Sequence, residues 1–226
     1  MKEYKYTKET GLSVIIRYSK RYHDTLANRR YLIIFRDPEQ NRLEALEVYF
    51  SSKNYQHLTG LDMVDRNGKI REHCAKEFFD KCTNATITAK DVEIHDRSVF
   101  DMKVENLPCV TEFIKIARMA EKYDESRPYL QGDYIIGGIK GCIGIRRNEK
   151  EHIYHPCSSL KENILNFSSL KPCQILLILE YNKQEKLFSE IRHVGKGVNP
   201  LNLNYPEDIE PKICLKKYKI SETTNI

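Results

Sequence analysis

The sequence has 226 residues, with 37 Lys and Arg against 32 Asp and Glu, which gives a formal net charge of +5. That length suits one domain with a substantial core, and the mild charge permits an anionic partner without requiring one. The polar start of the chain argues against a signal peptide, and no apolar run approaches the ~18 residues of a membrane span, so we expect a soluble, cytoplasmic protein without membrane contact.

The first half of the chain predicts helices around one hairpin. Residues 7–28 carry apolar side chains at three- and four-residue steps, which is typical of an amphipathic helix. Two apolar runs at 31–36 and 43–50 flank a turn signal at Asp37-Pro38 and predict a β-hairpin. Further elements are expected at residues 70–82 (helix), 88–91 (start of a short helix), 98–104 (strand) and 107–123 (helix).

The second half is richer in strands. Residues 129–145 are glycine-rich and apolar, and strands are expected at 153–154, 173–181 and 187–194. This order predicts an α+β fold, with N-terminal helices and a β-hairpin followed by a C-terminal antiparallel sheet. We expect one domain over residues 1–200 and a polar, Lys-rich tail over residues 201–226.

The cysteines and histidines do not predict a metal site. Seven cysteines are present, an odd number without a CxxC pair, which favours reduced thiols over a disulfide framework. His152, His155 and Cys157 lie close in sequence, but no second cluster completes four zinc ligands. We therefore expect neither a metal nor a cofactor.

The run His57-Leu58-Thr59-Gly60 is the first candidate for a functional site, and we expect it where a strand ends. The imidazole of His57 and the hydroxyl of Thr59 can contact a phosphate or a base edge, and Gly60 allows close approach of a ligand. In the alternative, Gly60 is a plain turn residue and His57 is bonded to backbone. The residue types alone favour that alternative.

Other segments supply cations and hydroxyls near strand ends. Arg127 could clamp a phosphate through its planar guanidinium, and Tyr129 could stack on a base. Lys140, between glycines, could reach into a cleft. Ser158 lies in a segment rich in His, Cys and Ser, and Lys196 lies in the run that follows the last strand. Arg127 and Tyr129 could equally be an ordinary surface residue and an edge residue. Lys140 and Lys196, each taken alone, are more often ordinary exposed residues.

These side chains share one chemistry. RNA cleavage without a metal needs a base for the 2′-hydroxyl, an acid for the leaving 5′-oxygen, and cations or donors that stabilise the charge at phosphorus. His, Tyr, Arg, Lys, Ser and Thr can supply all three functions. The sequence therefore favours RNA chemistry over chemistry that depends on paired carboxylates or a metal cage.

Several segments together resemble a known family. They are YLIIFRD, FSSKNYQHLTG, EFFDKC, SRPYLQGDYIIGGIKGCIGI, YHPCSSLKENI and ILLILEYNKQEKLFSEIRHVGKG. The chain is similar, over about residues 1–200, to the phage-associated nuclease domain of the Barnase–EndoU–colicin–RelE (BECR) superfamily, fourth phage type. The resemblance implies a compact core of two helices and a four-stranded antiparallel sheet, with additions. It also implies a metal-independent ribonuclease used as a toxin or in phage conflict.

The resulting hypothesis is an endoribonuclease that acts on RNA, for example tRNA, with an antitoxin or immunity protein as a further partner. His57 acts as base or acid, and Arg127 and Lys140 stabilise the phosphorane. The expected substrate-binding residues are Thr59, Tyr129, Ser158 and Lys196.

Two alternatives stay open. In the first, the chain is a phage accessory module that binds RNA or protein without cleaving it. In the second, His57, Tyr129 and Glu190 follow the order of the His–Tyr–Glu set of some ADP-ribosyltransferases, a weak signal because three common residues occur in order by chance.

Overall fold

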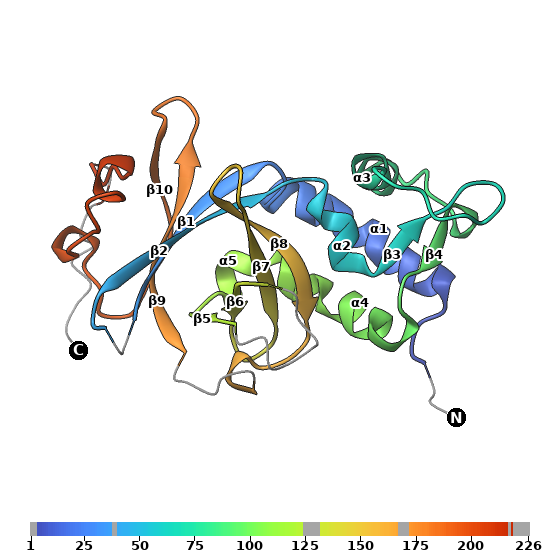
Figure 1. The fold of residues 1–226 in the computed structure, drawn as a ribbon, viewed down its shortest axis with the longest axis horizontal. Helices are drawn as coiled ribbons and strands as arrows, with labels where there is room; N and C mark the ends of the chain where they lie inside the picture. The colour runs from blue at the N-terminus through green and yellow to red at the C-terminus, as the bar shows by residue number, and fades with distance from the viewer. Residues whose placement is uncertain (1–3, 38–39, 124–131, 167–171, 217, 219–226) are drawn as a thin grey trace.

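The computed structural model describes residues 4–37, 40–123, 132–166, 172–216 and 218. Helices gather at one end of an elongated molecule and a large sheet occupies the other (Figure 1). The helices are α1 (Lys8–Thr25), α2 (Asn54–Thr59), α3 (Ala75–Thr83), α4 (Arg97–Thr111) and α5 (Phe113–Ile116). The strands are β1 (Arg29–Arg36), β2 (Leu43–Phe50), β3 (Leu61–Met63), β4 (Val92–Ile94), β5 (Met119–Lys122), β6 (Tyr134–Gly137), β7 (Cys142–Asn148), β8 (Ile153–Leu160), β9 (Cys173–Asn182) and β10 (Leu187–Val194). Within the described ranges, no helix combines the length and the apolar character needed to cross a bilayer.

The eight strands of the large sheet follow the order β1-β2-β8-β7-β6-β5-β9-β10, and the pairing of β1 with β9 closes the first seven of them into a ring, with β10 added at β9. The predicted hairpin of β1 and β2 is confirmed, with a register from Arg29 opposite Phe50 to Arg36 opposite Leu43. Strand β1 also pairs with β9, and β2 meets β8 in parallel at Val48 and Tyr154. The α+β class is therefore correct, and the C-terminal strands pair with one another antiparallel, as expected. The hairpin belongs to the same sheet, and one of its pairings is parallel.

Helix α1 confirms the amphipathic pattern. Thr7 and Thr10 form a capping box at its N-terminus, which satisfies backbone groups that the helix leaves free. Its apolar stripe, including Leu12 and Ile15, is buried against the other helices. At Gly11 an added Cβ would lie 2.5 Å from the ring of Phe100, so only glycine lets α1 and α4 approach this closely.

The region between residues 70 and 123 differs most from expectation. The stretch predicted as a strand at 98–104 is the start of α4, capped by Asp96, whose side chain accepts from the Ser98 amide. The apolar spacing fits both periods, because Phe100, Val104 and Leu107 also share a helical face. The helix predicted over 107–123 ends earlier, with α5, and the chain then becomes strand β5.

The described part of the expected tail packs onto the sheet. Ile209 is buried, and Tyr205 and Ile213 are half-buried, in a second apolar cluster with residues of β1, β9 and β10. An isolated parallel bridge joins Phe188 and Ile213. These residues cover apolar side chains of the sheet, so the region beyond residue 200 is not simply a polar extension.

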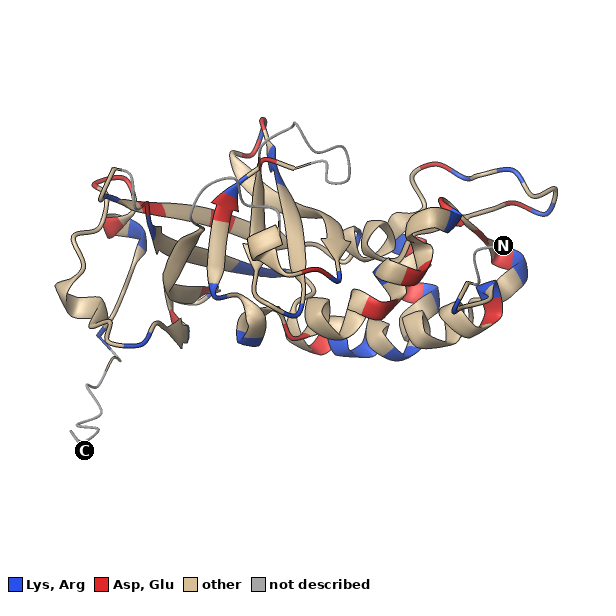
Figure 2. Ribbon diagram, turned by 90° about the horizontal axis from the view of Figure 1, so that it is seen from below, with Lys and Arg blue, Asp and Glu red and all other residues tan. Residues whose placement is uncertain are grey.

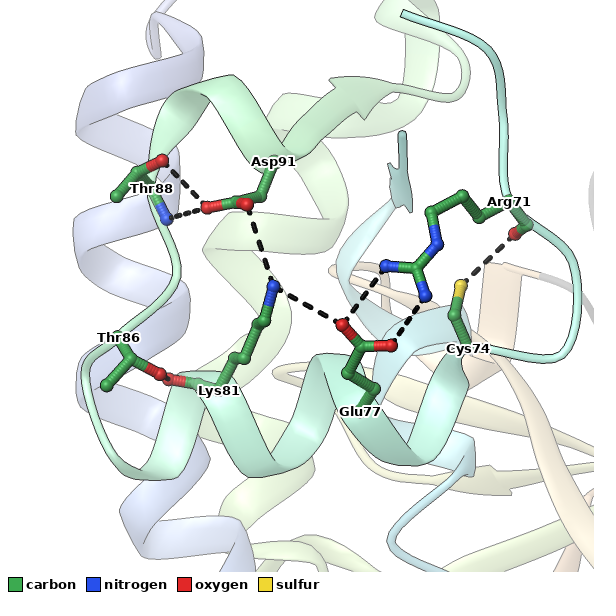
Figure 3. Close-up of polar contacts among 7 residues, drawn as sticks. All are labelled: Arg71, Cys74, Glu77, Lys81, Thr86, Thr88 and Asp91. Atoms are coloured by element: carbon green, nitrogen blue, oxygen red, sulfur yellow. Dashed lines mark hydrogen bonds and ion pairs between the residues drawn. The ribbon is translucent and has the colours of Figure 1, made fainter. Parts of the chain in front are cut away.

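A polar network fixes the segments on both sides of α3 (Figure 3). The Arg71 guanidinium donates to both carboxylate oxygens of Glu77, at 3.0 and 2.7 Å. Lys81 reaches Glu77 at 3.3 Å and Asp91 at 3.6 Å. Asp91 in turn accepts from the backbone and hydroxyl of Thr88, both at 2.7 Å. The network therefore holds the turn that leads directly into β4.

Candidate active site

A groove of about 540 Å³ lies between α2, β3, the start of α4 and β8. Its volume falls within the ~300–1,000 Å³ that is usual for ligand sites. Its polar lining combines two imidazoles, an ammonium group, carboxylates, a thiol and a hydroxyl. These groups belong to His57, Asp62, His95, Asp96, Lys103, Cys157 and Ser158, and Gln56 and Ser98 add an amide and a second hydroxyl.

His57 reaches the groove because α2 is short and ends sharply. The helix has six residues, and Gly60 closes it in the left-handed conformation, with φ of +76°. The expectation that His57 lies where a strand ends is therefore wrong, since it occupies the last turn of a helix. Part of the residue stays exposed to solvent, and the rest lines the groove.

Lys103 approaches the same turn from α4. Its Nζ donates to the backbone carbonyl of His57 at 2.9 Å. Burial lowers the pKa of Lys103, while the carboxylates of Asp62 and Asp96 act in the opposite direction. The stem of the side chain passes close to Gly60, where an added Cβ would lie 3.2 Å from Lys103 Cδ. Gly60 is thus needed for its backbone conformation and for the space that Lys103 occupies.

The pKa of His57 is lowered from its usual value of 6.5. The main cause is loss of solvent around the ring, followed by the positive charge of Lys103. Asp62 raises the pKa of His57, and His95 lowers it further. The imidazole of His57 is therefore mostly neutral at neutral pH, as a proton acceptor must be.

Sequence reasoning missed His95, as it missed Lys103 and Asp62. Strands β3 and β4 pair with Leu61 opposite Ile94, and the His95 amide donates to the Gly60 carbonyl at 3.0 Å. The Nδ1 atom of His95 lies 2.6 Å from a carboxylate oxygen of Asp62. A carboxylate at one ring nitrogen fixes the orientation of the imidazole and leaves Nε2 for a ligand. The only sequence signal was the short pair of segments LDM and VEI, which form these two strands.

One part of the groove is apolar. Leu61, Val99, Met102 and Leu160 contribute to its lining. An apolar surface beside imidazoles and an ammonium group suits a ligand with a flat ring and a charged group, because the ring loses water while the charge keeps polar partners.

The structure brings only part of the predicted site together. Ser158 joins His57 in the groove. Thr59 is fully buried, where its hydroxyl donates to the Gln56 carbonyl at 2.8 Å and accepts from the Leu61 amide at 3.3 Å. That hydroxyl stabilises the turn at the end of α2 and does not line the groove.

The remaining candidates lie elsewhere. Lys140 is exposed in the turn between β6 and β7, and Lys196 is exposed after β10; neither lines the groove. Glu190, on β10, does not line it either. Arg127 and Tyr129 lie outside the described residues. Among the residues that are described, no three His, Cys, Asp or Glu side chains are arranged to hold a metal ion.

Fold and groove together define an α+β protein with a site built from imidazoles and an ammonium group. Comparison with protein families gives one match, over residues 15–195, to the family described as phage-Barnase-EndoU-ColicinE5/D-RelE like nuclease4. The chain belongs to this nuclease family, and the resemblance stated from its sequence is confirmed. Neither the curated proteins nor the solved structures contain a significant match.

Proposed function

We propose that this protein is an endoribonuclease that cleaves RNA without a metal ion, by attack of the 2′-hydroxyl on the adjacent phosphate. The observation that carries the proposal is the convergence of His57, His95 and Lys103 on one groove from three different elements. Membership of a nuclease family supports a nucleic acid as the substrate. RNA is favoured over DNA because two imidazoles suit acid–base transfer to and from ribose oxygens.

In the proposed reaction His57 is the base, because its lowered pKa keeps the imidazole neutral. It takes the proton of the 2′-hydroxyl, and the 2′-oxygen forms a bond to phosphorus. His95, which Asp62 orients through Nδ1, gives its proton to the 5′-oxygen as the P–O5′ bond breaks. The products are a 2′,3′-cyclic phosphate and a 5′-hydroxyl. His57 leaves the step protonated and His95 leaves it neutral, so the protons balance.

Lys103 supplies the positive charge that the phosphorane requires. Its ammonium group is already held beside His57, and the hydroxyl of Ser158 adds a donor from β8. In this proposal Lys103 takes the role first expected for Lys140. Thr59 and Lys196 take no part in catalysis, since neither lines the groove.

The wider biological context is also a proposal. The family description names phage, together with Barnase, EndoU, colicins E5 and D and RelE. We infer a role as a toxin or in phage conflict, with tRNA as one substrate to test and an antitoxin or immunity protein as a partner.

The test is cleavage of labelled RNA, including tRNA, in the presence and absence of EDTA. The wild-type protein should cleave in both conditions and give a 2′,3′-cyclic phosphate by mass spectrometry. His57→Ala and His95→Ala should each lose at least about 100-fold in rate. His23→Ala is a matched control, because His23 is exposed on α1 outside the groove.

Two results would contradict the proposal. If EDTA abolished cleavage and a divalent ion restored it, the mechanism would be wrong. If RNA bound without any product over long incubation, the chain would instead be the non-catalytic binding module that the sequence left open.

A further inference from the structure

The outer face of α1 carries a basic stripe formed by Arg17, Lys20 and Arg21, all exposed. A run of basic segments is visible along the lower edge of the helices in Figure 2. Residues three and four apart share one face of a helix, so these three cations are neighbours. None of them forms an ion pair with the described part of the chain. Asp24, four residues after Lys20, contacts His23 instead.

This arrangement is unfavourable for the helix alone. Like charges at a spacing of four residues repel each other and destabilise a helix. The sequence nevertheless places Arg21 one turn after Arg17, and both guanidinium groups contact the ring of Tyr18. Their guanidinium carbons lie 5.2 and 5.5 Å from the centre of its ring. The ring therefore holds two guanidinium groups side by side while their N–H donors stay free for a ligand.

The basic stripe continues into a second cleft, of about 640 Å³, which Arg21 also lines. The cleft shares no lining residue with the groove that contains His57. Leu26 and Tyr31, both buried, contribute apolar surface. The volume is again within the ~300–1,000 Å³ that is usual for a bound small ring system and its substituents.

The side chains that line this cleft carry a small net positive charge, which favours an anion. Glu180 accepts from Arg29 at 3.1 Å and from Arg192 at 2.7 Å. Two guanidinium groups thus surround one carboxylate, so this trio carries a net positive charge. Arg21 and Lys115 add cations to the lining, and Asp24 and Glu112 add carboxylates, with Glu112 3.9 Å from Lys115. With Arg29, Arg192 and Glu180 the lining has four cations against three carboxylates, so the cleft keeps a net charge of +1.

We propose that the basic stripe and the adjoining cleft bind a second stretch of the RNA substrate, with phosphates on the stripe and one base in the cleft. This inference rests on the function proposed above for its substrate class. Paired guanidinium groups beside a cleft of nucleotide size are features that recognise single-stranded RNA. The site adds affinity for long RNA and takes no part in the bond-breaking step.

The test uses a stripe variant in which Arg17, Lys20 and Arg21 are all changed to Gln. Binding is measured by fluorescence anisotropy with a long single-stranded 2′-O-methyl oligonucleotide, which cannot be cleaved. The variant should bind about 10- to 100-fold more weakly. The slope of log K against log salt should fall by about 2, because each lost phosphate contact on a single strand contributes about 0.7.

A charge-matched control separates a site from a general charge effect. Lys122, Lys150 and Lys183 are exposed on the sheet and its hairpins, and their triple change to Gln removes the same charge. This control should bind RNA nearly as the wild type does. Equal losses in the two variants would overturn the proposal, and so would unchanged binding by the stripe variant. If the stripe variant bound RNA as the wild type does, the alternative ligand of the stripe would be an acidic protein surface.

Cleavage of a dinucleotide separates this inference from the proposed function. A dinucleotide is too short to occupy groove and stripe together, so the stripe variant should cleave it at the wild-type rate. If the wild type cleaves no RNA at all, the proposed function fails while the binding measurement still tests the stripe. If the stripe variant loses dinucleotide cleavage with unchanged thermal unfolding, the stripe belongs to the catalytic site and this inference is wrong.

Discussion

Replacing Gly60 by Ala should disturb both the backbone and the position of Lys103. The residue has φ of +76°, and the left-handed conformation costs a residue with a Cβ about 1–2 kcal/mol. The new Cβ would also lie 3.2 Å from Lys103 Cδ. Moving that flexible stem off its preferred rotamer costs about 0.5–1.5 kcal/mol more. We expect a total loss of about 1.5–3.5 kcal/mol in the free energy of unfolding.

Gly68→Ala is the matched control for the backbone term. Gly68 has φ of +78°, and nothing lies within 4 Å of its ideal Cβ. Gly68→Ala should therefore lower the free energy of unfolding only by the cost of the left-handed backbone conformation. By urea unfolding, or as Tm at about 2–4 °C per kcal/mol for a chain of this size, Gly60→Ala should be clearly the less stable of the two. Equal losses would refute the argument that Lys103 is packed against Gly60.

Three further predictions concern charge. Lys103→Met should lower kcat/KM about 10²- to 10³-fold. It should also move the acid limb of the pH profile of kcat/KM to higher pH, because loss of a nearby cation raises the pKa of His57. An unmoved acid limb would contradict the proposed coupling between Lys103 and His57. Asp62→Asn should lower kcat at least about tenfold with little change in KM, because His95 loses the carboxylate that orients its ring. An unchanged kcat would show that Asp62 has no part in the mechanism. The hydrogen bond from Arg71 lowers the pKa of Glu77 below 4.5. The Glu77 carboxylate therefore stabilises the fold above pH 4.5, and this stabilisation is lost as the pH falls. The free energy of unfolding in urea should vary less with pH between about 5 and 3 for Glu77→Gln than for the wild type.

Local sequence patterns identified the elements whose signals are short in range. The hairpin of β1 and β2 followed from two apolar runs around a turn, and α1 from its apolar stripe. The strands β9 and β10 also agree with the pattern around residues 182–185. These features depend on neighbours within one or two turns, which a sequence displays directly.

The stretch around α4 shows where local patterns fail. Phe100 and Val104 are consistent with a strand or a helix, and only burial against α1 decides between them. The network of Arg71, Glu77 and Asp91 likewise joins segments whose individual side chains look like ordinary surface charges. Tertiary contacts, rather than propensity, select the structure here.

By itself the sequence determined the α+β class and the nuclease family, and it supplied His57 as a candidate that stays a prediction. The tertiary structure decided which groups share a groove with it, adding His95 and Lys103 to Ser158 and leaving Lys140 and Lys196 elsewhere. The physical reason is distance along the chain. The pairing of β3 with β4, the packing of α4 on α2 and the contact of β8 with α2 are all non-local. No periodicity within a single segment reveals which ends will meet.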